Sequence, residues 1–258
     1  MSRIIAIANQ KGGVGKSTTA INLSACLAEK NQKVLAIDID PQGNTTSGLG
    51  VDKDEQEATV YELLIGECDL SDCIVNTSFD NLSLIPSNVN LAAAEIELIG
   101  VDGKEFILRD QIANVRDEYD YIIIDCPPSL SMLTINAMTP ADTVLVPIQC
   151  EYYALEGLSQ LMHTIDLVQQ RLNPNLEIEG IVFTMYDART NLSLQVVENV
   201  KSNLHQSIYK TIIPRNVRLA EAPSHGLPIN VYDSKSAGAE SYRLLADEVM
   251  HREDEEWQ

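Results

Sequence analysis

The feature that most constrains the fold is a glycine-rich stretch, NQKGGVGKSTT (residues 9–19), placed between two segments of different periodicity. The preceding residues 3–8, RIIAIA, form a continuous apolar run that is typical of a buried strand. The following residues 17–30 carry apolar side chains at helical spacing. A strand that leads through a glycine-rich turn into a helix presents backbone N–H groups to an anion, so we expect an α/β unit with an anion site at its turn.

Strand-like and helix-like segments alternate along the rest of the chain. Short apolar runs bounded by turn-forming residues predict strands at 33–38, 81–87, 119–128, 142–149, 178–186, 209–215 and 227–232. Apolar residues at helical spacing predict helices at 90–99, 104–118, 155–173, 191–206 and 237–253. This alternation indicates a P-loop NTPase-like α/β fold, with a mostly parallel, twisted sheet covered by helices on both faces.

The length and the composition favour one domain. The 258 residues show no break in composition, no linker and no internal repeat. We therefore expect a single domain over residues 1–258, with an acidic tail at about residues 252–258. The N-terminus runs directly into a strand pattern, so we expect no signal peptide and a cytoplasmic location.

Each residue type in the glycine-rich stretch suits the binding of a nucleotide's phosphates. Glycines let the backbone approach closely, Lys16 should reach the β- and γ-phosphates, and the Ser17 hydroxyl should bind Mg²⁺. The residues expected to contact the nucleotide here are Gly12, Gly13, Val14, Gly15, Lys16, Ser17 and Thr18. Because G-K-S-T-T lies between a strand and an amphipathic helix, the sequence predicts nucleotide binding over an ordinary βα turn.

Two residues depart from the usual G-x-x-x-x-G-K-[ST] pattern. Gln10 occupies the place of the first glycine, and Lys11 adds a second lysine. The sequence K-G-G-V-G-K-S resembles the deviant Walker A box of the ParA/MinD group of ATPases. The resemblance implies that ATP is bound by a sandwich homodimer, in which Lys11 of one subunit reaches the phosphates held by the other. Lys11 would then act catalytically, as an arginine finger does, and the alternative is a solvated surface lysine.

Three aspartates lie where phosphoryl transfer needs a metal and an oriented water. Asp125 ends the apolar strand of IIIDCPP, as a Walker B aspartate should, and we expect it to hold Mg²⁺ through a water. Asp38 and Asp40 end a strand in AIDIDPQGN, which resembles the second box of the family. That resemblance assigns Asp40 to the attacking water and Asp38 to the network around the metal. A strand-end hydrogen bond is the alternative for Asp38.

Longer segments resemble the ParA/Soj chromosome-partitioning ATPases in particular. They are DCPPSLSMLTINAM, PIQCEYYALEGLSQL, TMYDARTNLSLQV and IPRNVRLAEAPSHGLPI, which spread the resemblance over residues 4–245. Such proteins are expected to bind DNA non-specifically as ATP dimers, on the nucleoid, and to release it when a ParB (Spo0J) partner stimulates hydrolysis. The resemblance implies that Met185, Pro214 and Asn216 contact the adenine. Whether the cargo is a chromosome, a plasmid or another body stays open.

The charge of the chain is unevenly distributed. The formal net charge of −20 opposes binding to a polyanion such as DNA. Residues 185–243, however, hold seven basic and five acidic residues, a net charge of +2, against −22 for the remainder. Arg189 and Arg218 match positions implicated in DNA contact in Soj-like proteins, and Lys235 lies where relatives are richer in arginine. We expect these three to give salt-sensitive DNA binding, with solvated or ion-paired arginines as the alternative.

A MinD-like role in positioning at the membrane is the nearest alternative function. It would require a basic amphipathic helix at the C-terminus, which anionic lipid attracts. The sequence instead ends DEVMHREDEEWQ, and no apolar run reaches the ~18 residues of a membrane span, so we expect no membrane partner. A nucleotide-switched scaffold with negligible turnover is a further alternative, against which Asp40 and Lys11 argue.

The cysteines follow no metal-binding pattern. They are Cys26, Cys68, Cys73, Cys126 and Cys150. With an odd number and no C-x-x-C pair, small buried thiols are favoured over a zinc or iron–sulfur site.

Overall fold

The structure, a computed structural model, describes residues 2–151, 154–203 and 207–255. Its strands are β1 (Arg3–Ile7), β2 (Val34–Asp38), β3 (Val75–Asn76), β4 (Leu82–Ile85), β5 (Tyr121–Asp125), β6 (Thr143–Gln149), β7 (Glu177–Tyr186) and β8 (Ile208–Pro214). Within the described residues, eight strands form one sheet in the order β3-β4-β2-β5-β1-β6-β7-β8. Only β3 and β4 pair antiparallel among these described strands, so the predicted mostly parallel sheet is confirmed.

Helices connect the strands and cover the sheet. The α-helices are α1 (Lys16–Glu29), α2 (Asn44–Gly48), α3 (Val60–Ile65), α4 (Leu70–Cys73), α5 (Leu91–Glu97), α6 (Ile107–Ile112), α7 (Met132–Met138), α8 (Ala154–Arg171), α9 (Asn191–Asn203), α10 (Val217–Glu221), α11 (Ile229–Tyr232) and α12 (Ala237–Glu255). Short 3₁₀ helices are η1 (Lys104–Phe106), η2 (Arg116–Glu118) and η3 (Ala222–His225).

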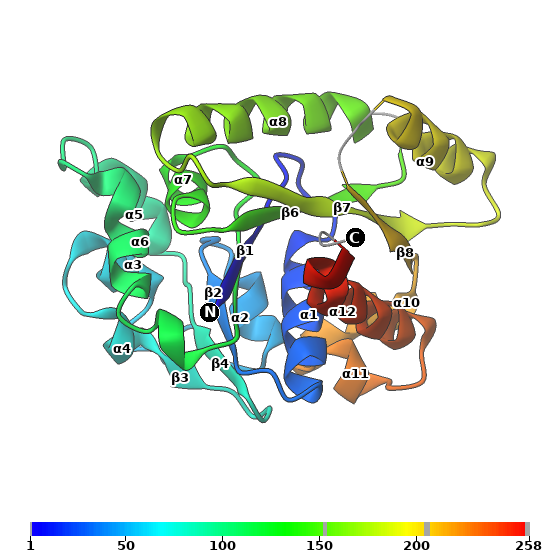
Figure 1. Cartoon of the computed structure of the whole chain (residues 1–258). Helices are drawn as coiled ribbons and strands as arrows, with labels where there is room; N and C mark the ends of the chain where they lie inside the picture. The colour runs from blue at the N-terminus through cyan, green and yellow to red at the C-terminus, as the bar shows by residue number, and fades with distance from the viewer. Residues whose placement is uncertain (1, 152–153, 204–206, 256–258) are drawn as a thin grey trace.

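Successive residues of the central strands point into two separate hydrophobic cores. In β1, Ile4 and Ala6 join one core, while Ile5 and Ile7 join the other, because side chains alternate along a strand. The first core includes residues of α3, α5, α6, α7 and α8, and the second includes residues of α1, α11 and α12. Figure 1 shows α8 on one side of the sheet and α1 and α12 on the other. The prediction of helices on both faces is therefore confirmed.

The prediction of a strand at residues 227–232 is wrong. The segment LPINVY contains the short helix α11, in which the Tyr232 N–H donates to the Pro228 carbonyl over 2.9 Å. The Ile229 N–H donates to Asn22 Oδ1 of α1 over 2.7 Å, which draws the segment onto that helix. A short apolar run is compatible with either a strand or a buried helical turn, and here the contact with α1 favours the helical turn.

The helix predicted over residues 104–118 is broken into η1, α6 and η2. After α6, the N–H groups of Asn114 and Val115 donate to carbonyls three residues back, which tightens the turn and ends the helix. The predicted acidic tail at 252–258 is helical up to Glu255, where α12 ends, and residues 256–258 lie outside the described residues.

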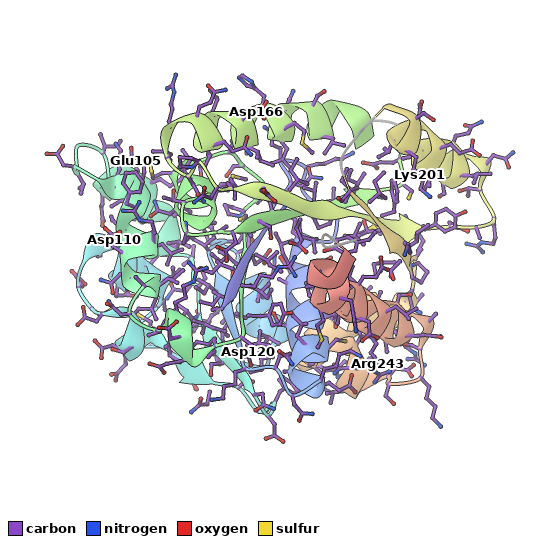
Figure 2. All side chains as sticks on the ribbon, in the orientation of Figure 1. Glu105, Asp110, Asp120, Asp166, Lys201 and Arg243 are labelled. Carbon is purple, nitrogen blue, oxygen red and sulfur yellow. The ribbon has the colours of Figure 1, made fainter. Side chains whose placement is uncertain are left out.

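Most charged side chains lie on the outside of the fold, whereas Lys16, Asp38, Asp40, Asp125 and Glu179 are buried. Figure 2 labels Glu105, Asp110, Asp120 and Asp166, of which the three aspartates are exposed; they are among the acidic residues that give the chain its net charge of −20. Over the described part of the chain, no helix combines the length and the apolar character that crossing a bilayer requires.

Candidate active site

The carboxyl ends of three adjacent central strands meet at one edge of the sheet. In the register of β2 and β5, Asp38 lies opposite Asp125, and in the register of β1 and β5, Ile7 lies opposite Asp125. The glycine-rich stretch follows β1 directly, so both aspartates lie beside it. Ligands of open α/β sheets bind at this edge, where the order of the strands changes direction.

The glycine-rich stretch has the backbone of a phosphate loop. Gly15 has a φ of +92° in the left-handed region, where a residue with a Cβ would be strained, and α1 begins at the next residue. Thr184 of β7 fixes the loop, because its hydroxyl donates to the Val14 carbonyl over 2.8 Å. The first turn of α1 carries no acidic side chain. The positive end of the helix dipole is therefore not neutralised by a carboxylate of that turn and can attract a phosphate.

Lys16 is the first residue of α1, and its side chain folds back against the glycine-rich loop. Its side chain is buried, and Nζ donates to the Lys11 carbonyl over 3.2 Å. Burial lowers the pKa of Lys16, whereas the carboxylates of Asp125 and Asp40 oppose this shift. The ammonium group therefore binds the backbone of the loop and feels the charges of Asp125 and Asp40.

Asp125 is fully buried beside Ser17. Its Oδ2 accepts a hydrogen bond from Thr45 Oγ1 over 2.7 Å, and its Oδ1 has no hydrogen-bond partner among the described residues. Burial raises the pKa of Asp125 to about 8, the charge of Asp38 adds to this, and hydrogen bonds from Thr45 and Ser17 oppose it. A buried, unpartnered carboxylate oxygen next to a serine hydroxyl suits a hard divalent cation such as Mg²⁺. The donor set therefore fits the predicted metal.

Asp38 orders the loop after β2. Its Oδ2 accepts from both the N–H and the hydroxyl of Thr46 over 2.8 Å, and its Oδ1 accepts from the Asp40 N–H over 3.2 Å. Burial raises the pKa of Asp38 to about 6, although these hydrogen bonds oppose the shift. The strand-end hydrogen bond considered for Asp38 is thus present, and through it Asp38 positions Asp40.

The loop that carries Asp40 is held from two sides. Asp40 Oδ1 accepts from the Gln42 N–H over 3.0 Å, and its carbonyl accepts from Ser87 Oγ over 2.8 Å. Sequence reasoning recognised DPQGNTTSGLG only as turn-forming, so it missed Thr45 and Thr46. Two threonines in the loop that follows a strand-end aspartate could have suggested side-chain partners for the carboxylates.

The Lys11 side chain is bound by a residue far from it in the sequence. Its ammonium group forms an ion pair with Glu151, which comes after the end of β6. The Lys11 N–H donates to Asn9 Oδ1 over 3.0 Å, so the backbone of the loop is also fixed at this point. The lysine side chain is 38% exposed and the glutamate side chain 31%. The sequence offered no signal for this partner.

A cavity of about 200 Å³ adjoins the phosphate loop. It brings together the three residues predicted to contact adenine, and it is lined by Gly15, Thr18, Thr184, Met185, Ile213, Pro214, Arg215, Asn216, Leu219, Ala220 and Tyr242. Met185 has a φ of +52°, a strained value for a residue with a side chain, and such strain gathers at functional sites. Asn216 caps α10, because its Oδ1 accepts from the N–H groups of Arg218 and Leu219. The cavity has a size and an apolar lining that suit a base.

The residues predicted to contact DNA lie on separate segments. Arg189, in the turn before α9, donates to Asp187 over 2.7 and 2.8 Å. Arg218, on α10, pairs with Glu221 over 2.9 Å and with Asp233 over 3.5 Å. Lys235 is exposed just before α12. Both arginines are therefore exposed ion-pair partners in the isolated chain.

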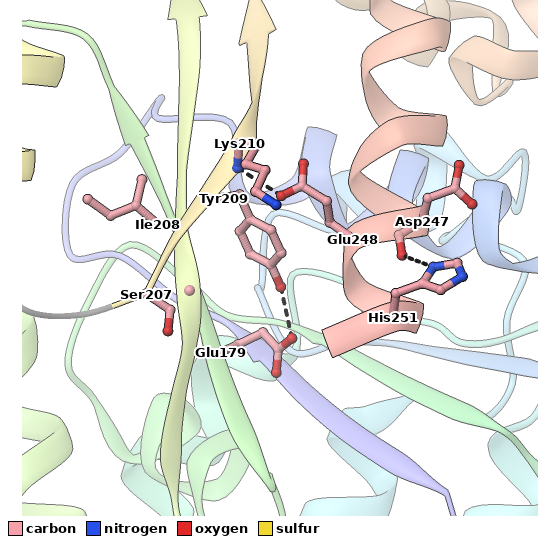
Figure 3. Close-up of a pocket in the computed structure, with 9 residues that line it drawn as sticks. Glu179, Ser207, Ile208, Tyr209, Lys210, Asp247, Glu248 and His251 are labelled. Atoms are coloured by element: carbon pink, nitrogen blue, oxygen red, sulfur yellow. Dashed lines mark hydrogen bonds between the residues drawn. The ribbon is translucent and has the colours of Figure 1, made fainter. Parts of the chain in front are cut away.

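A larger cavity of about 290 Å³ lies at the opposite edge of the sheet, between β8 and the end of α12 (Figure 3). Its buried Glu179 accepts hydrogen bonds from Arg3 and Tyr209, and Glu248 accepts from the Lys210 N–H. The polar groups of this cavity thus bind one another. We assign the active site to the phosphate-loop edge, where Asp125 Oδ1 is buried and has no hydrogen-bond partner in the part of the chain that the structure describes.

The chain is similar in sequence to known proteins over nearly its whole length. The chain matches the family model described as an AAA domain over residues 2–178. It is 58% identical over 249 residues to the sporulation initiation inhibitor protein Soj of Bacillus subtilis (strain 168), covering 96% of this chain and 98% of Soj. It is 53% identical to the chromosome partitioning protein ParA of Myxococcus xanthus (strain DK1622), over 98% of this chain and 89% of ParA.

A solved structure supports the same fold. Cobyrinic acid a,c-diamide synthase from Mycobacterium smegmatis, with bound ADP and magnesium, superposes with a TM-score of 0.88 at 38% identity. The match covers 98% of this chain and 96% of that chain.

Proposed function

This chain belongs to the ParA and Soj family of chromosome-partitioning ATPases, and we propose that it hydrolyses ATP, dimerises around it and binds DNA non-specifically with a ParB-type partner. The observation that carries the proposal is the meeting of Lys16, Ser17 and Asp125 at one edge of the sheet, with Asp125 Oδ1 still unpartnered among the described residues. A site with a cation, a hydroxyl and a buried carboxylate beside a glycine loop suits the phosphates of a nucleotide.

The cavity beside the loop gives the nucleotide its orientation. We place the adenine among Met185, Pro214 and Asn216, and the phosphates on the N–H groups of the glycine loop. Ser17 and Asp125 would hold Mg²⁺, which when bound supplies positive charge to the phosphate oxygens. Because one cavity is continuous with the loop through Gly15 and Thr18, base and phosphates can be bound together.

Three residues carry the proposed hydrolysis. Asp40 accepts a hydrogen bond from the attacking water, and its loop is held rigid by Asp38 and Ser87. Lys16 neutralises charge on the phosphates of its own subunit. Lys11 leaves Glu151 and neutralises charge on the nucleotide held by the second subunit, which couples dimerisation to hydrolysis.

DNA binding rests on Arg189, Arg218 and Lys235, in the part of the chain with a local net charge of +2. Phosphate groups must compete with Asp187 and Glu221 for the two arginines, and the net charge of −20 repels DNA at longer range. The proposed binding is therefore confined to low or moderate salt. It also accounts for a cytoplasmic location on the nucleoid.

The decisive test measures ATP turnover of the full chain with Mg²⁺, alone and with DNA and a ParB-type protein. The expected result is slow turnover that both additions raise, and loss of the stimulated rate in Asp40→Ala. Asp54→Ala is the matched control, because Asp54 is an exposed aspartate in the same region of the chain, away from the site. Equal stimulated rates in the wild type and Asp40→Ala would refute the catalytic assignment.

A further inference from the structure

Two cysteines that are five residues apart in the sequence are in contact at one corner of the fold. Cys68, which follows α3, and Cys73, the last residue of α4, place their sulfur atoms 3.1 Å apart as free thiols. This separation is about 1 Å longer than the ~2.05 Å bond of a disulfide. The two sulfur atoms are therefore already in contact without a bond between them.

The two thiols differ in their surroundings. Cys68 is partly exposed, whereas Cys73 is buried and its thiol lies against the carbonyls of Thr59 and Asp69, at 3.4 and 3.7 Å. An oxidant in solution can thus reach Cys68, and Cys73 lies behind it as the resolving thiol. The remaining cysteines of the chain, Cys26, Cys126 and Cys150, are buried.

The corner around the pair can accommodate the small movement that a bond requires. Cys68 and Cys73 are joined by the short helix α4, and Glu67, Ser71 and Asp72 around them are exposed. A metal site is not supported, since the described residues contain no group of three or more potential ligands. Two thiols in contact, one accessible and one shielded, are instead the arrangement of a redox pair.

We propose that Cys68 and Cys73 form a redox modification site, which closes to an intramolecular disulfide when the chain meets hydrogen peroxide and reopens with a dithiol. The Cys68 thiolate attacks the peroxide oxygen, the O–O bond breaks, and water leaves after protonation, so Cys68 becomes a sulfenic acid. The Cys73 sulfur then attacks Cys68 Sγ, the S–O bond breaks, and the thiol proton leaves with the hydroxide as a second water. Two thiols are oxidised by two electrons and one peroxide is reduced to two waters.

The surroundings of the two thiols also affect the rate of the reaction, through the pKa of each thiol. Burial raises the pKa of both thiols, and the carboxylates of Glu62 and Asp72 raise them further. Little thiolate is present at neutral pH, so the reaction is slow there, and the experiment is run in mildly alkaline buffer.

The experiment treats the full chain with hydrogen peroxide and measures the intact mass and the thiols titratable after unfolding. The expected result is the loss of two hydrogen atoms and a fall from five titratable thiols to three, both reversed by dithiothreitol. Cleavage before Asp69 or Asp72 separates the two cysteines, so the bridge should hold two peptides together until reduction. Unchanged mass, or uptake of oxygen on Cys68 without a bridge, would overturn the proposal.

Three variants complete the test. Cys68→Ser and Cys73→Ser should each abolish the loss of two hydrogens, and Cys73→Ser should instead accumulate a sulfenic acid on Cys68. Cys26→Ala removes a buried thiol of α1 and should leave the bridge unchanged. A bridge that persists in Cys73→Ser, or one that links two chains, would contradict the assignment. These readouts need no nucleotide, so they are independent of the proposed ATPase activity.

Discussion

Lys11 forms an ion pair with Glu151 of its own chain. The cation that we propose for the nucleotide of a second subunit is therefore bound to a carboxylate when the chain is alone. Both side chains are partly exposed, so the pair is weak, and a triphosphate with more negative charge can replace Glu151 as the partner.

Lys11→Ala should abolish ATP-dependent dimers and leave the fold intact, because the charge that reaches the second nucleotide is lost. Light scattering with ATP, with Asp40→Ala as the trapped dimer for reference, measures this. Lys33→Ala removes an exposed lysine away from the site and should dimerise normally. If Lys11→Ala dimerises as the wild type does, the lysine does not act between subunits.

Glu151→Gln should release Lys11 and lower the ATP concentration needed for dimerisation. An exposed ion pair contributes about 0.2–1 kcal/mol, so the midpoint should fall by up to about fivefold. Titration of ATP with light scattering as the readout gives the midpoint. A higher midpoint in the variant would mean that Glu151 assists the dimer and does not compete with it.

Asp125→Asn should stabilise the nucleotide-free protein more at pH 9 than at pH 5. Burial raises the folded-state pKa of Asp125 to about 8, above its ordinary value. Stability from this group is therefore present at low pH and is lost as the pH rises through about 8. Asparagine does not ionise, so the variant does not lose stability as the pH rises. Each kcal/mol by which the free energy of unfolding increases should raise Tm by about 2–4 °C. Thermal melts at both pH values measure the difference.

The control for this prediction is Asp110→Asn, which changes an exposed aspartate of α6. Its effect on Tm should be small at both pH values. If Asp125→Asn shifts Tm equally at pH 5 and pH 9, the Asp125 carboxyl does not titrate with a raised pKa.

ATP with Mg²⁺ should raise Tm, and Ser17→Ala should lose the part that depends on Mg²⁺. At a ligand concentration of 100 times Kd, binding stabilises by about 2.7 kcal/mol, which corresponds to roughly 5–10 °C here. The measurement compares ATP with Mg²⁺ against ATP with a chelator, for both proteins. If Mg²⁺ raises Tm equally in Ser17→Ala and in the wild type, the Ser17 hydroxyl does not bind the metal.

Arg189→Ala and Arg218→Ala should each weaken DNA binding without loss of ATP-dependent dimers. Each lost phosphate contact should reduce the slope of log K against log salt by about 1. Binding across a salt series with ATP, ADP and no nucleotide measures both quantities. Arg109→Ala, which removes an exposed arginine stacked on Phe106, is the control. Unchanged retention of DNA at low salt would refute the role of the two arginines.

The local sequence determined the phosphate loop and the class of fold. Gly13 and Gly15 adopt positive φ angles in the turn between β1 and α1, which glycine adopts without strain. The spacing of apolar residues in the flanking segments matches a strand before the turn and a helix after it. The resemblance to the ParA/Soj family, read from motifs, is confirmed by the relatives at 58% and 53% identity. The loop and the alternation of strands and helices depend on neighbouring residues, so spacing and periodicity suffice to predict them, whereas the family came from the resemblance of longer motifs.

Only the tertiary structure decided which distant residues meet. The register of β2 on β5 sets Asp38 opposite Asp125, and the order of the strands brings Thr184 and Met185 to the phosphate loop. The same holds for the helix α11, which replaces the strand predicted at 227–232 and is bound to Asn22 of α1. Strand order and packing depend on the free energy of the whole chain, and a window of neighbouring residues does not contain that information.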